Sequence, residues 1–208
     1  MKLYSHELSG HVHRVRLFAS LIGLELQLAP VDLAAGAHKQ PDFLAKNPFG
    51  QLPVLEDGDV TLYDSTAIIV YLASRYDLSG QWLPDDPQTR AEVQIWLSKA
   101  ANEVANGIGA ARLVTVFNAP YDHAAVIAKA HELLTILEQH LDGRGWLVGD
   151  SPTLAEVALY SYIAHGPEGG VDLRGYPRVS NWLQRIENLP GFVPMQATDT
   201  AAKQALQN

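Results

Sequence analysis

The sequence contains no cysteine among its 208 residues. A chain without cysteine cannot form disulfide bonds, bind a metal ion through thiolates or use a thiol of its own as a nucleophile. It also lacks an apolar run of the roughly 20 residues needed to span a bilayer. Its first residues enter an apolar segment at once, without the pattern of a signal peptide. We therefore expect a cytoplasmic protein without a membrane partner.

Basic side chains are in the minority. The chain has 15 Lys and Arg residues against 23 Asp and Glu residues, a net charge of −8. An acidic surface is repelled by phosphate backbones and anionic lipids, which argues against a general nucleic-acid or membrane-surface binder. The hydrophobic fraction of 47% is that of an ordinary globular protein. This balance still permits a local group of basic residues that holds a small anion.

The first part of the chain alternates between strand and helix patterns. Asp57-Gly58, between two short apolar runs, is typical of a tight hairpin turn, and Asp64 or Ser65 can cap the next helix. The predicted elements are strands over 2–5, 26–31, 52–56 and 59–63, and helices over 10–21, 41–46 and 65–76. This βαβ–ββα order predicts a small mixed sheet with helices packed against it.

The second part of the chain is helical throughout. Apolar residues recur at helical spacing from Val93 towards Leu113, and again over 126–141, 154–161 and 179–186. Thr153-Leu154-Ala155-Glu156 has the spacing of a capping box at the start of one of these helices. The pattern predicts a helical bundle.

A linker is predicted between the two parts, because residues 78–88 are rich in glycine and proline and have little periodicity. We therefore expect an α/β domain over 1–77 and an all-helical domain over 89–208. The polar end of the chain after Pro194 is expected to be loosely ordered.

Ser9 stands at the junction between the first strand and the first helix. Its hydroxyl can cap the helix by accepting a bond from a free N–H group. The free N–H groups and the positive dipole end at the same helix start also stabilise an anion such as a thiolate. The local pattern is compatible with both roles, and residues further along the chain bear on the choice.

Several segments of the chain resemble, in order and at matching spacing, the glutathione transferases. The start of the chain, Leu-Tyr-x-x-x-Leu-Ser ending at Ser9, is similar to the serine-type, phi- and theta-like classes, and the lack of cysteine excludes the cysteine-type classes. The segments that carry the resemblance are Ala37-His38-Lys39, Asn47 to Leu55, Asp64 to Ile68, and Gly149 to Glu156. The resemblance implies a thioredoxin-like domain followed by a helical bundle, with glutathione as co-substrate.

The resemblance also implies a role for each matching residue. Ser9 stabilises the glutathione thiolate, and a cis Leu52-Pro53 bond presents the Leu52 backbone to the cysteinyl part of glutathione. The expected contacts at the two ends of glutathione are Lys39, His38 and Gln51 for the glycyl carboxylate, Ser65 for the γ-glutamyl carboxylate, and Asp64 for the ammonium group.

A small hydrophobic electrophile is the expected second substrate, held in a cleft between the two domains. We expect its walls to include the first loop and the first bundle helix near Asn106, Ala110 and Leu113. A homodimer is also expected, with apolar contact from the helix that carries Ile68, Ile69 and Tyr71 and from the long helix after Asp86.

No metal site is predicted. His11 and His13 lie two positions apart, which puts them on different faces of a helix, and no carboxylate or cysteine pattern joins them. His165 lines a cleft or makes a polar contact in the core, and we favour the core.

Two alternatives to an enzyme remain open. A regulatory protein could bind glutathione without turnover, and a structural module could keep the fold alone. The presence of Lys39, Gln51, Asp64 and Ser65 argues against the structural module. These residues do not separate a binding protein from an enzyme.

Overall fold

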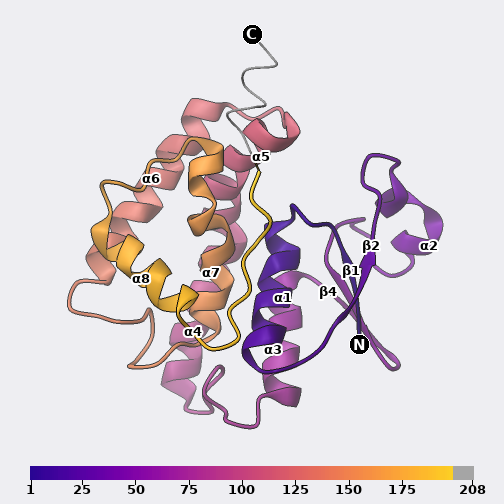
Figure 1. The fold of residues 1–208 in the computed structure, drawn as a ribbon, viewed down its shortest axis with the longest axis horizontal. Helices are drawn as coiled ribbons and strands as arrows, with labels where there is room; N and C mark the ends of the chain where they lie inside the picture. The colour runs from indigo at the N-terminus through magenta and orange to yellow at the C-terminus, as the bar shows by residue number, and fades with distance from the viewer. Residues whose placement is uncertain (199–208) are drawn as a thin grey trace.

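The computed structural model describes residues 1–198, which form a four-stranded sheet with helices followed by a helical bundle (Figure 1). The elements of the first part are β1 Lys2–Ser5, α1 Gly10–Leu21, β2 Gln27–Pro30, the 3-10 turn η1 Ala37–Lys39, α2 Pro41–Leu44, β3 Val54–Asp57, β4 Val60–Tyr63 and α3 Ser65–Tyr76. The predicted βαβ–ββα order is confirmed.

The sheet is mixed, with the strand order β2-β1-β3-β4. β1 runs parallel to β2 and antiparallel to β3, so that Leu3 lies opposite Leu28 on one side and Leu55 on the other. The hairpin between β3 and β4 turns at Gly58, whose φ of +58° is readily available only to glycine. Helices α1 and α3 cover the face of the sheet that is turned towards the bundle, and α2 lies on the other side (Figure 1).

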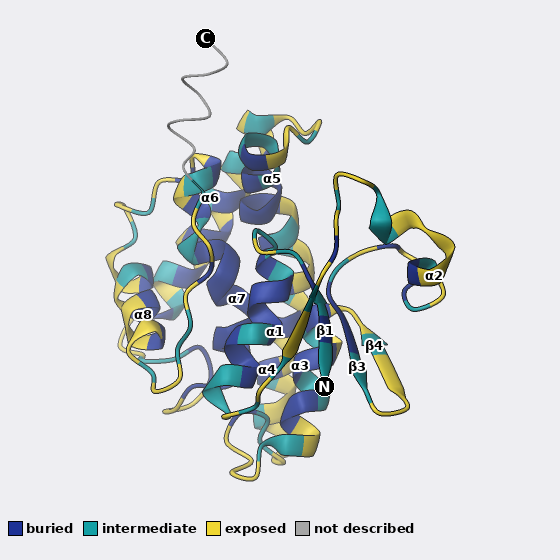
Figure 2. Cartoon of the chain, turned by 45° about the vertical axis from the view of Figure 1, so that its right-hand side comes forward, coloured by how far each residue is buried: buried dark blue, intermediate teal, exposed yellow. Residues whose placement is uncertain are grey.

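The core lies between the sheet, these two helices and the bundle, where Figure 2 shows a continuous band of buried residues. Leu3 of β1, Phe18 of α1 and Ile68 and Ile69 of α3 are fully buried in it. The expectation that Ile68 and Ile69 supply a dimer contact is therefore wrong, because both side chains face the protein's own core. Tyr71 is half-buried and donates a hydrogen bond to Asp57.

The bundle begins with one long helix. Its elements are α4 Pro87–Lys99, the π-helical segment η2 Ala100–Gly109, α5 Ala110–Phe117, α6 His123–His140, α7 Leu154–Ala164, the 3-10 turn η3 Gly166–Gly169 and α8 Pro177–Glu187. The long helix runs without a break from Pro87 to Phe117 and ends at Asn118, which has a positive φ.

The segment predicted as a linker is attached to both domains. Asp86 caps α4, so this helix begins inside the segment 78–88. The ring of Trp82 packs edge-on against Phe18 with 5.5 Å between centroids, and its carbonyl accepts a bond of 2.8 Å from the Leu154 N–H. The boundaries 1–77 and 89–208 stay predictions.

Helix α7 is the centre of the bundle and is almost entirely buried. The predicted capping box is present: Thr153 accepts from the Ala155 N–H, and Glu156 accepts from the Thr153 N–H at 2.7 Å. Glu156 also accepts from the Leu147 N–H at 2.6 Å. Burial raises the pKa of Glu156 above its ordinary range.

The C-terminal segment returns across the molecule between α1 and the bundle (Figure 1). The expectation of loose order after Pro194 is wrong for residues 195–198. Met195 is buried, and the Thr198 N–H donates to Glu168 at 3.0 Å. Residues 199–208, which complete the predicted tail and the predicted helical domain, lie outside the described residues.

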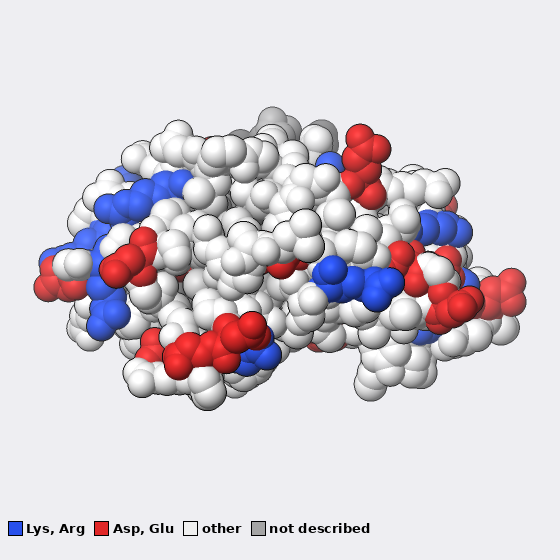
Figure 3. All heavy atoms as spheres, turned by 90° about the horizontal axis from the view of Figure 1, so that it is seen from below, with Lys and Arg blue, Asp and Glu red and all other residues white. Residues whose placement is uncertain are grey.

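Charged side chains form small, separate groups of both signs on the face of the molecule seen in Figure 3, with uncharged surface between them. None of the helices within residues 1–198 is long and apolar enough to cross a membrane.

Candidate active site

Two adjoining cavities lie beside the start of α1. The larger, of about 400 Å³, opens between the loops of the first domain and the bundle helices α5 and α7. The smaller, of about 280 Å³, lies over the start of α3. All the predicted site residues line one or both cavities: Ser9, His38 and Lys39 the larger, Pro53, Asp64 and Ser65 the smaller, and Gln51 and Leu52 both.

Ser9 is the N-cap of α1 and also lines the larger cavity. Its Oγ accepts a hydrogen bond of 3.3 Å from the Val12 N–H. Because the oxygen acts as the acceptor in this bond, the hydroxyl proton is still available to donate. Capping and donation into the cavity are therefore compatible in one side chain.

The loop that carries His38 and Lys39 is held close to Gly50. The Lys39 ammonium donates to the carbonyls of Phe49 and Gly50 at 3.1 and 2.9 Å. Gly50 has a φ of +58°, and a Cβ there would lie 2.8 Å from the His38 carbonyl, so only glycine fits. Among residues 1–198, the buried Nδ1 atom of His38 has no hydrogen-bond partner. A buried polar atom is rarely left unpaired, so this nitrogen is an exception within the site.

Asp64 and Ser65 form the start of α3. Asp64 caps this helix by accepting from the Thr66 and Ala67 N–H groups at 2.8 and 3.2 Å. Its φ of +69° is strained for a residue other than glycine, and such strain is often found at binding sites. Leu52-Pro53, beside them in the smaller cavity, is a cis peptide bond, as the resemblance implies.

Arg14 links the site to the bundle, a role that the sequence did not indicate. The side chain is almost fully buried, and its Nη1 donates to the Ser65 Oγ at 2.6 Å. Its Nε and Nη2 donate to the Ala158 carbonyl of α7 at 2.9 and 2.6 Å. Burial lowers the pKa of Arg14 from its ordinary value. One buried cation thus joins α1, α3 and α7.

His11 lines both cavities, whereas His13 points into the core. The ring of His13 bonds to the Ser161 Oγ at 2.9 Å and to the Val193 carbonyl at 2.8 Å. The two histidines therefore lie on different faces of α1, as predicted. Within residues 1–198, no group of three or more His, Cys, Asp or Glu side chains is arranged to hold a metal ion.

Tyr162 of α7 packs against the first turn of α1 and also lines the larger cavity. A Cβ at Gly10 would lie 2.7 Å from the Tyr162 ring, so glycine at this position lets the two helices approach. Burial raises the pKa of Tyr162, which keeps its hydroxyl protonated.

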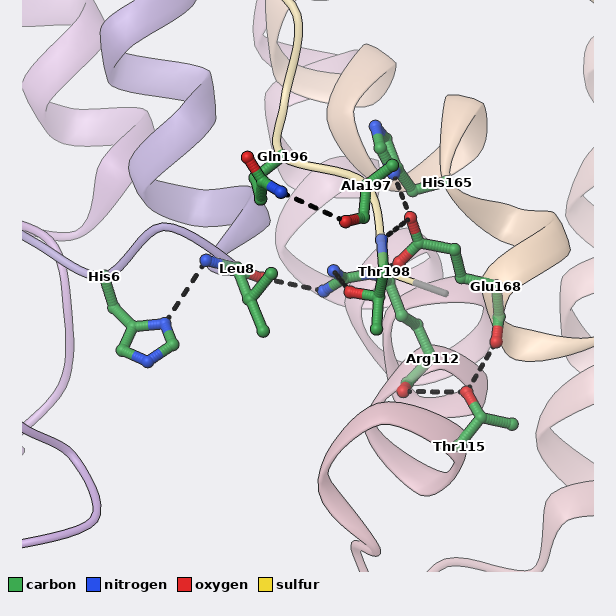
Figure 4. A network of polar contacts seen from close by, with 9 residues as sticks. All are labelled: His6, Leu8, Arg112, Thr115, His165, Glu168, Gln196, Ala197 and Thr198. Carbon is green, nitrogen blue, oxygen red and sulfur yellow. Dashed lines mark hydrogen bonds and ion pairs between the residues drawn. The ribbon is translucent and has the colours of Figure 1, made fainter. Parts of the chain in front are cut away.

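Arg112 of α5 fastens the Ser9 loop to the bundle (Figure 4). Its Nη1 donates to the Leu8 carbonyl at 2.8 Å and its Nε to Glu168 at 2.7 Å. The side chains of Arg112 and Glu168 are only 2% and 11% exposed. His165 bonds to the other oxygen of Glu168 at 2.7 Å, so it makes a polar contact within the bundle, the alternative we favoured.

The three residues predicted to form the wall of the electrophile site do not share one cavity. Leu113 lines the larger cavity together with Phe117, but Ala110 is buried in the packing. Asn106 lines a different cavity of about 730 Å³ on the α6 side of the long helix. Asn106 and Leu113 are seven positions apart, which is about two turns of an α-helix. In a regular α-helix the two side chains would therefore lie on the same face. The π-helical segment has more residues per turn and rotates Asn106 away.

The comparisons with known proteins agree with this arrangement. The family models for the glutathione S-transferase N-terminal and C-terminal domains match residues 1–74 and 108–190. Glutathione S-transferase 3 of Zea mays is 38% identical over 203 residues, which cover 92% of this chain and 91% of that protein. The chain belongs to the glutathione S-transferase family. The thioredoxin-like first domain and the helical second domain are those of a glutathione S-transferase, and the protein is an enzyme of this type.

Solved structures of glutathione S-transferases share the whole fold. The crystal structure of the Pseudomonas fluorescens Pf-5 enzyme matches with a TM-score of 0.88 at 32% identity, over 94% of this chain and 98% of that one. A homologue from Drosophila mojavensis, crystallised with bound glutathione, matches with a TM-score of 0.83 at 27% identity, over 99% and 94% of the two chains.

Proposed function

We propose that this glutathione S-transferase stabilises the thiolate of glutathione with the Ser9 hydroxyl and transfers glutathione to a small hydrophobic electrophile. The observation that carries the proposal is the position of Ser9, a hydroxyl that lines the larger cavity at the start of α1. The positive end of the helix dipole favours an anion at this point.

The two cavities offer complementary groups for the charged ends of glutathione. Lys39, His38 and Gln51 stand in the larger cavity and suit the glycyl carboxylate, whereas Ser65 and Asp64 in the smaller one suit the γ-glutamyl carboxylate and ammonium. Leu52 lines both cavities, and on this proposal its backbone pairs with the peptide between the two ends. The homologue with bound glutathione supports this assignment by its shared fold.

The Ser9 hydroxyl and the start of α1 can together supply the free energy needed to ionise the glutathione thiol. A free thiol has a pKa of about 8.5, and lowering it by two pH units requires roughly 2.7 kcal/mol. A hydrogen bond to a charged acceptor contributes about 1.5–3 kcal/mol, and a helix N-terminus about 0.3–1 kcal/mol. Ser9 and α1 together are therefore sufficient, and no protein base is required.

The electrophile binds, on this proposal, on the bundle side of the larger cavity. Leu113 and Phe117 give this wall its apolar character, and the Phe117 ring is 41% exposed. An apolar wall beside a thiolate suits a small hydrophobic molecule with an electrophilic carbon. The cytoplasmic location and the lack of nucleic-acid and membrane partners stay predictions from the sequence.

We also propose a homodimer. Its surface differs from the expected one on the first domain, where Ile68 and Ile69 are buried, but it keeps the long helix after Asp86, which carries Ile95. Large apolar side chains are exposed on both domains: Phe49 and Tyr63 on the first, at 66% and 37%, and Ile95 and Ile136 on the bundle, at 55% and 58%. Phe49 and Tyr63 lie ring to ring with 5.9 Å between centroids. A two-fold axis would bury the patch of one domain against the other domain of the partner.

Ser9→Ala tests the proposed mechanism. We expect slower conjugation of a chloronitrobenzene at neutral pH, a pH–rate midpoint displaced upward, and partial recovery at high pH. If Ser9 only caps α1, the variant loses about 1 kcal/mol of stability and keeps the midpoint. If the protein binds glutathione without turnover, the wild type is retained on glutathione-agarose and gives no conjugate.

A further inference from the structure

His11 lies at the boundary of the two cavities, as do Gln51 and Leu52. It lines the larger cavity with Ser9 and the smaller one with Ser65. A ligand that extends from one cavity into the other must pass this ring. The proposed function gives His11 no role, although its position lies between the groups that hold the sulfur and the γ-glutamyl end of glutathione.

The hydrogen bonds of the ring determine which nitrogen carries the proton. The Nδ1 atom of His11 lies 3.1 Å from Nη1 of Arg14. A guanidinium has only donors, so Nδ1 must be the acceptor and the proton of the neutral ring is on Nε2. The second contact of Nδ1, at 3.3 Å from the Ser65 Oγ, is compatible with this tautomer.

The ring is neutral under ordinary conditions. Burial, and then the adjacent Arg14 cation, lower the pKa of His11 to about 3, against a smaller opposing effect of Asp64. His11 therefore offers a ligand a hydrogen-bond donor and no net charge, and its protonation state does not change in the neutral range.

The Nε2–H group of His11 is free and held in place. Within the part of the chain that the structure describes, it has no hydrogen-bond partner, whereas Nδ1 is turned towards Arg14 and Ser65. The ring packs edge-on against Tyr162, with 5.0 Å between centroids and 68° between planes. These contacts fix the orientation of the ring, and Nε2 is the ring nitrogen left for a ligand in the cavities that His11 lines.

We propose that His11 is a glutathione-binding residue, whose Nε2–H donates to the peptide carbonyl that links the γ-glutamyl and cysteinyl parts of glutathione. The proposal rests on the proposed placement of glutathione across both cavities. The acceptor is assigned to this carbonyl because His11 lies between the Ser9 and Ser65 subsites, where the linking peptide must run. Arg14 acts through His11 and Ser65 as a positioning residue.

Two substitutions of His11 separate the two functions of its ring, which are donation from Nε2–H into the cavity and acceptance by Nδ1 of the bond from Arg14. The amide of His11→Asn reaches the place of Nδ1 and can still accept from Arg14, but it has no donor at the place of Nε2. The amide of His11→Gln reaches the place of Nε2 and keeps a donor there. Steady-state kinetics with varied glutathione, melting temperature and the pKa of the bound thiol are measured for both variants and for Lys39→Ala.

We expect His11→Asn to raise the KM for glutathione by about threefold to tenfold, as loss of one neutral hydrogen bond predicts. His11→Gln should restore most of this loss, and the pKa of the bound thiol should stay that of the wild type. Equal KM values in the wild type and His11→Asn, or equal losses in both variants, would overturn the proposal. A change in the thiol pKa without a change in KM would also overturn it, because the donor would then act on the sulfur.

Lys39→Ala distinguishes this inference from the proposed function. If Lys39→Ala raises the KM and His11→Asn does not, glutathione occupies the proposed site and only the role of His11 is wrong. If neither variant changes the KM, the placement of glutathione itself is wrong.

Discussion

Ser9 and Asp64 each combine helix capping with a place in the site. Ser9 accepts from the Val12 N–H, and Asp64 accepts from two N–H groups of α3, while both residues line the cavities. A substitution at either position therefore changes helix stability and ligand binding together. Each variant of these residues needs a melting temperature beside its kinetics.

Lys39→Ala and Ser65→Ala test the two ends of the proposed glutathione site. Each should raise the half-saturating concentration of glutathione, because each removes a partner of a carboxylate. We expect the larger effect, of about tenfold or more, for Ser65, since it is buried and Arg14 holds its hydroxyl, whereas Lys39 is exposed and screened by water. Lys46→Ala, which removes a lysine paired with Glu56 outside both cavities, is the matched control. Unchanged glutathione saturation in both site variants would exclude this placement.

Some residues of the site could be predicted from the sequence around them, and others could not. Lys39, Gln51 and Ser65 lie in loops and at a helix start, where the resemblance could identify them. Arg14 and Arg112 lie within helices, and their partners Ala158 and Leu8 are 144 and 104 positions away in the chain. A buried cation in a helix can be recognised only once its distant partner is known.

At the scale of elements, one face of α1 borders the candidate active site and the other packs into the core. His11 borders the cavities, and His13 is held between Ser161 of α7 and the Val193 carbonyl of the C-terminal segment. The carbonyl can only accept, so Nε2 of His13 carries the proton and Nδ1 accepts from the Ser161 hydroxyl. Both bonds are satisfied by the neutral ring.

This environment predicts that the protein loses stability in acid. Burial is the main cause that lowers the pKa of His13 from 6.5 to about 4. As the pH falls below 6.5, the unfolded chain binds a proton that the folded chain does not, so the free energy of unfolding decreases until about pH 4. This lowering of the His13 pKa corresponds to a loss of roughly 3 kcal/mol in the free energy of unfolding. The lowered pKa of His11 adds to the loss.

Urea unfolding at pH 7.5 and pH 5 measures this effect. His13→Gln should reduce the loss of stability between the two conditions, although it lowers the stability at pH 7.5. His123→Gln removes a histidine from the start of α6 and serves as the control. An equal loss in the wild type and in His13→Gln would show that His13 is not the cause.

The elements themselves could largely be predicted. The strand over 2–5 and the helix over 10–21 have the predicted bounds, because apolar periodicity and the cap at Ser9 define both. The π-helical segment Ala100–Gly109 could not be predicted, since no local pattern marks the change of hydrogen bonding. Its effect on the face of the long helix explains why Leu113 lines the larger cavity beside Ser9 and Asn106 does not.

At the scale of the whole molecule, two buried arginines cross between the domains. Arg14 of the first domain bonds to α7, and Arg112 of the bundle bonds to the loop before Ser9. Glu168 compensates the charge of Arg112, and its pKa is kept below the ordinary value by bonds from His165, Thr198 and Arg112, although burial alone would raise it. The active-site loop therefore depends on the bundle for its position.

Removal of Arg112 should be far more damaging than removal of an exposed arginine. Arg112→Met leaves the Glu168 carboxylate buried without its main cation, which costs about 3–5 kcal/mol. Arg174→Ala breaks an exposed pair with Asp172, and such a pair contributes little to stability because water and salt screen it. Chemical denaturation of both variants checks the difference. Similar stability losses in the two would mean that the Arg112 network does not hold the domains together.

The proposed dimer can be tested by the mass of the protein in solution. The chain has a mass of 22.7 kDa, so a dimer sediments at twice this value. Phe49→Ser removes the most exposed of the apolar rings on the first domain and should shift the equilibrium towards the monomer. Sedimentation of the wild type as a monomer at micromolar concentration would contradict the proposal.

The pKa of the glutathione thiol bound to the enzyme is the most direct measure of the central claim. The ultraviolet absorbance of the thiolate can be titrated against pH at saturating glutathione for the wild type, Ser9→Ala and Ser9→Thr. We predict a midpoint about two pH units below the free value of about 8.5 for the wild type and for Ser9→Thr, which keeps a hydroxyl. For Ser9→Ala we predict a midpoint close to the free value. A midpoint that stays low in Ser9→Ala, with only a lower melting temperature, would contradict the role of Ser9 in catalysis and leave it as the cap of α1.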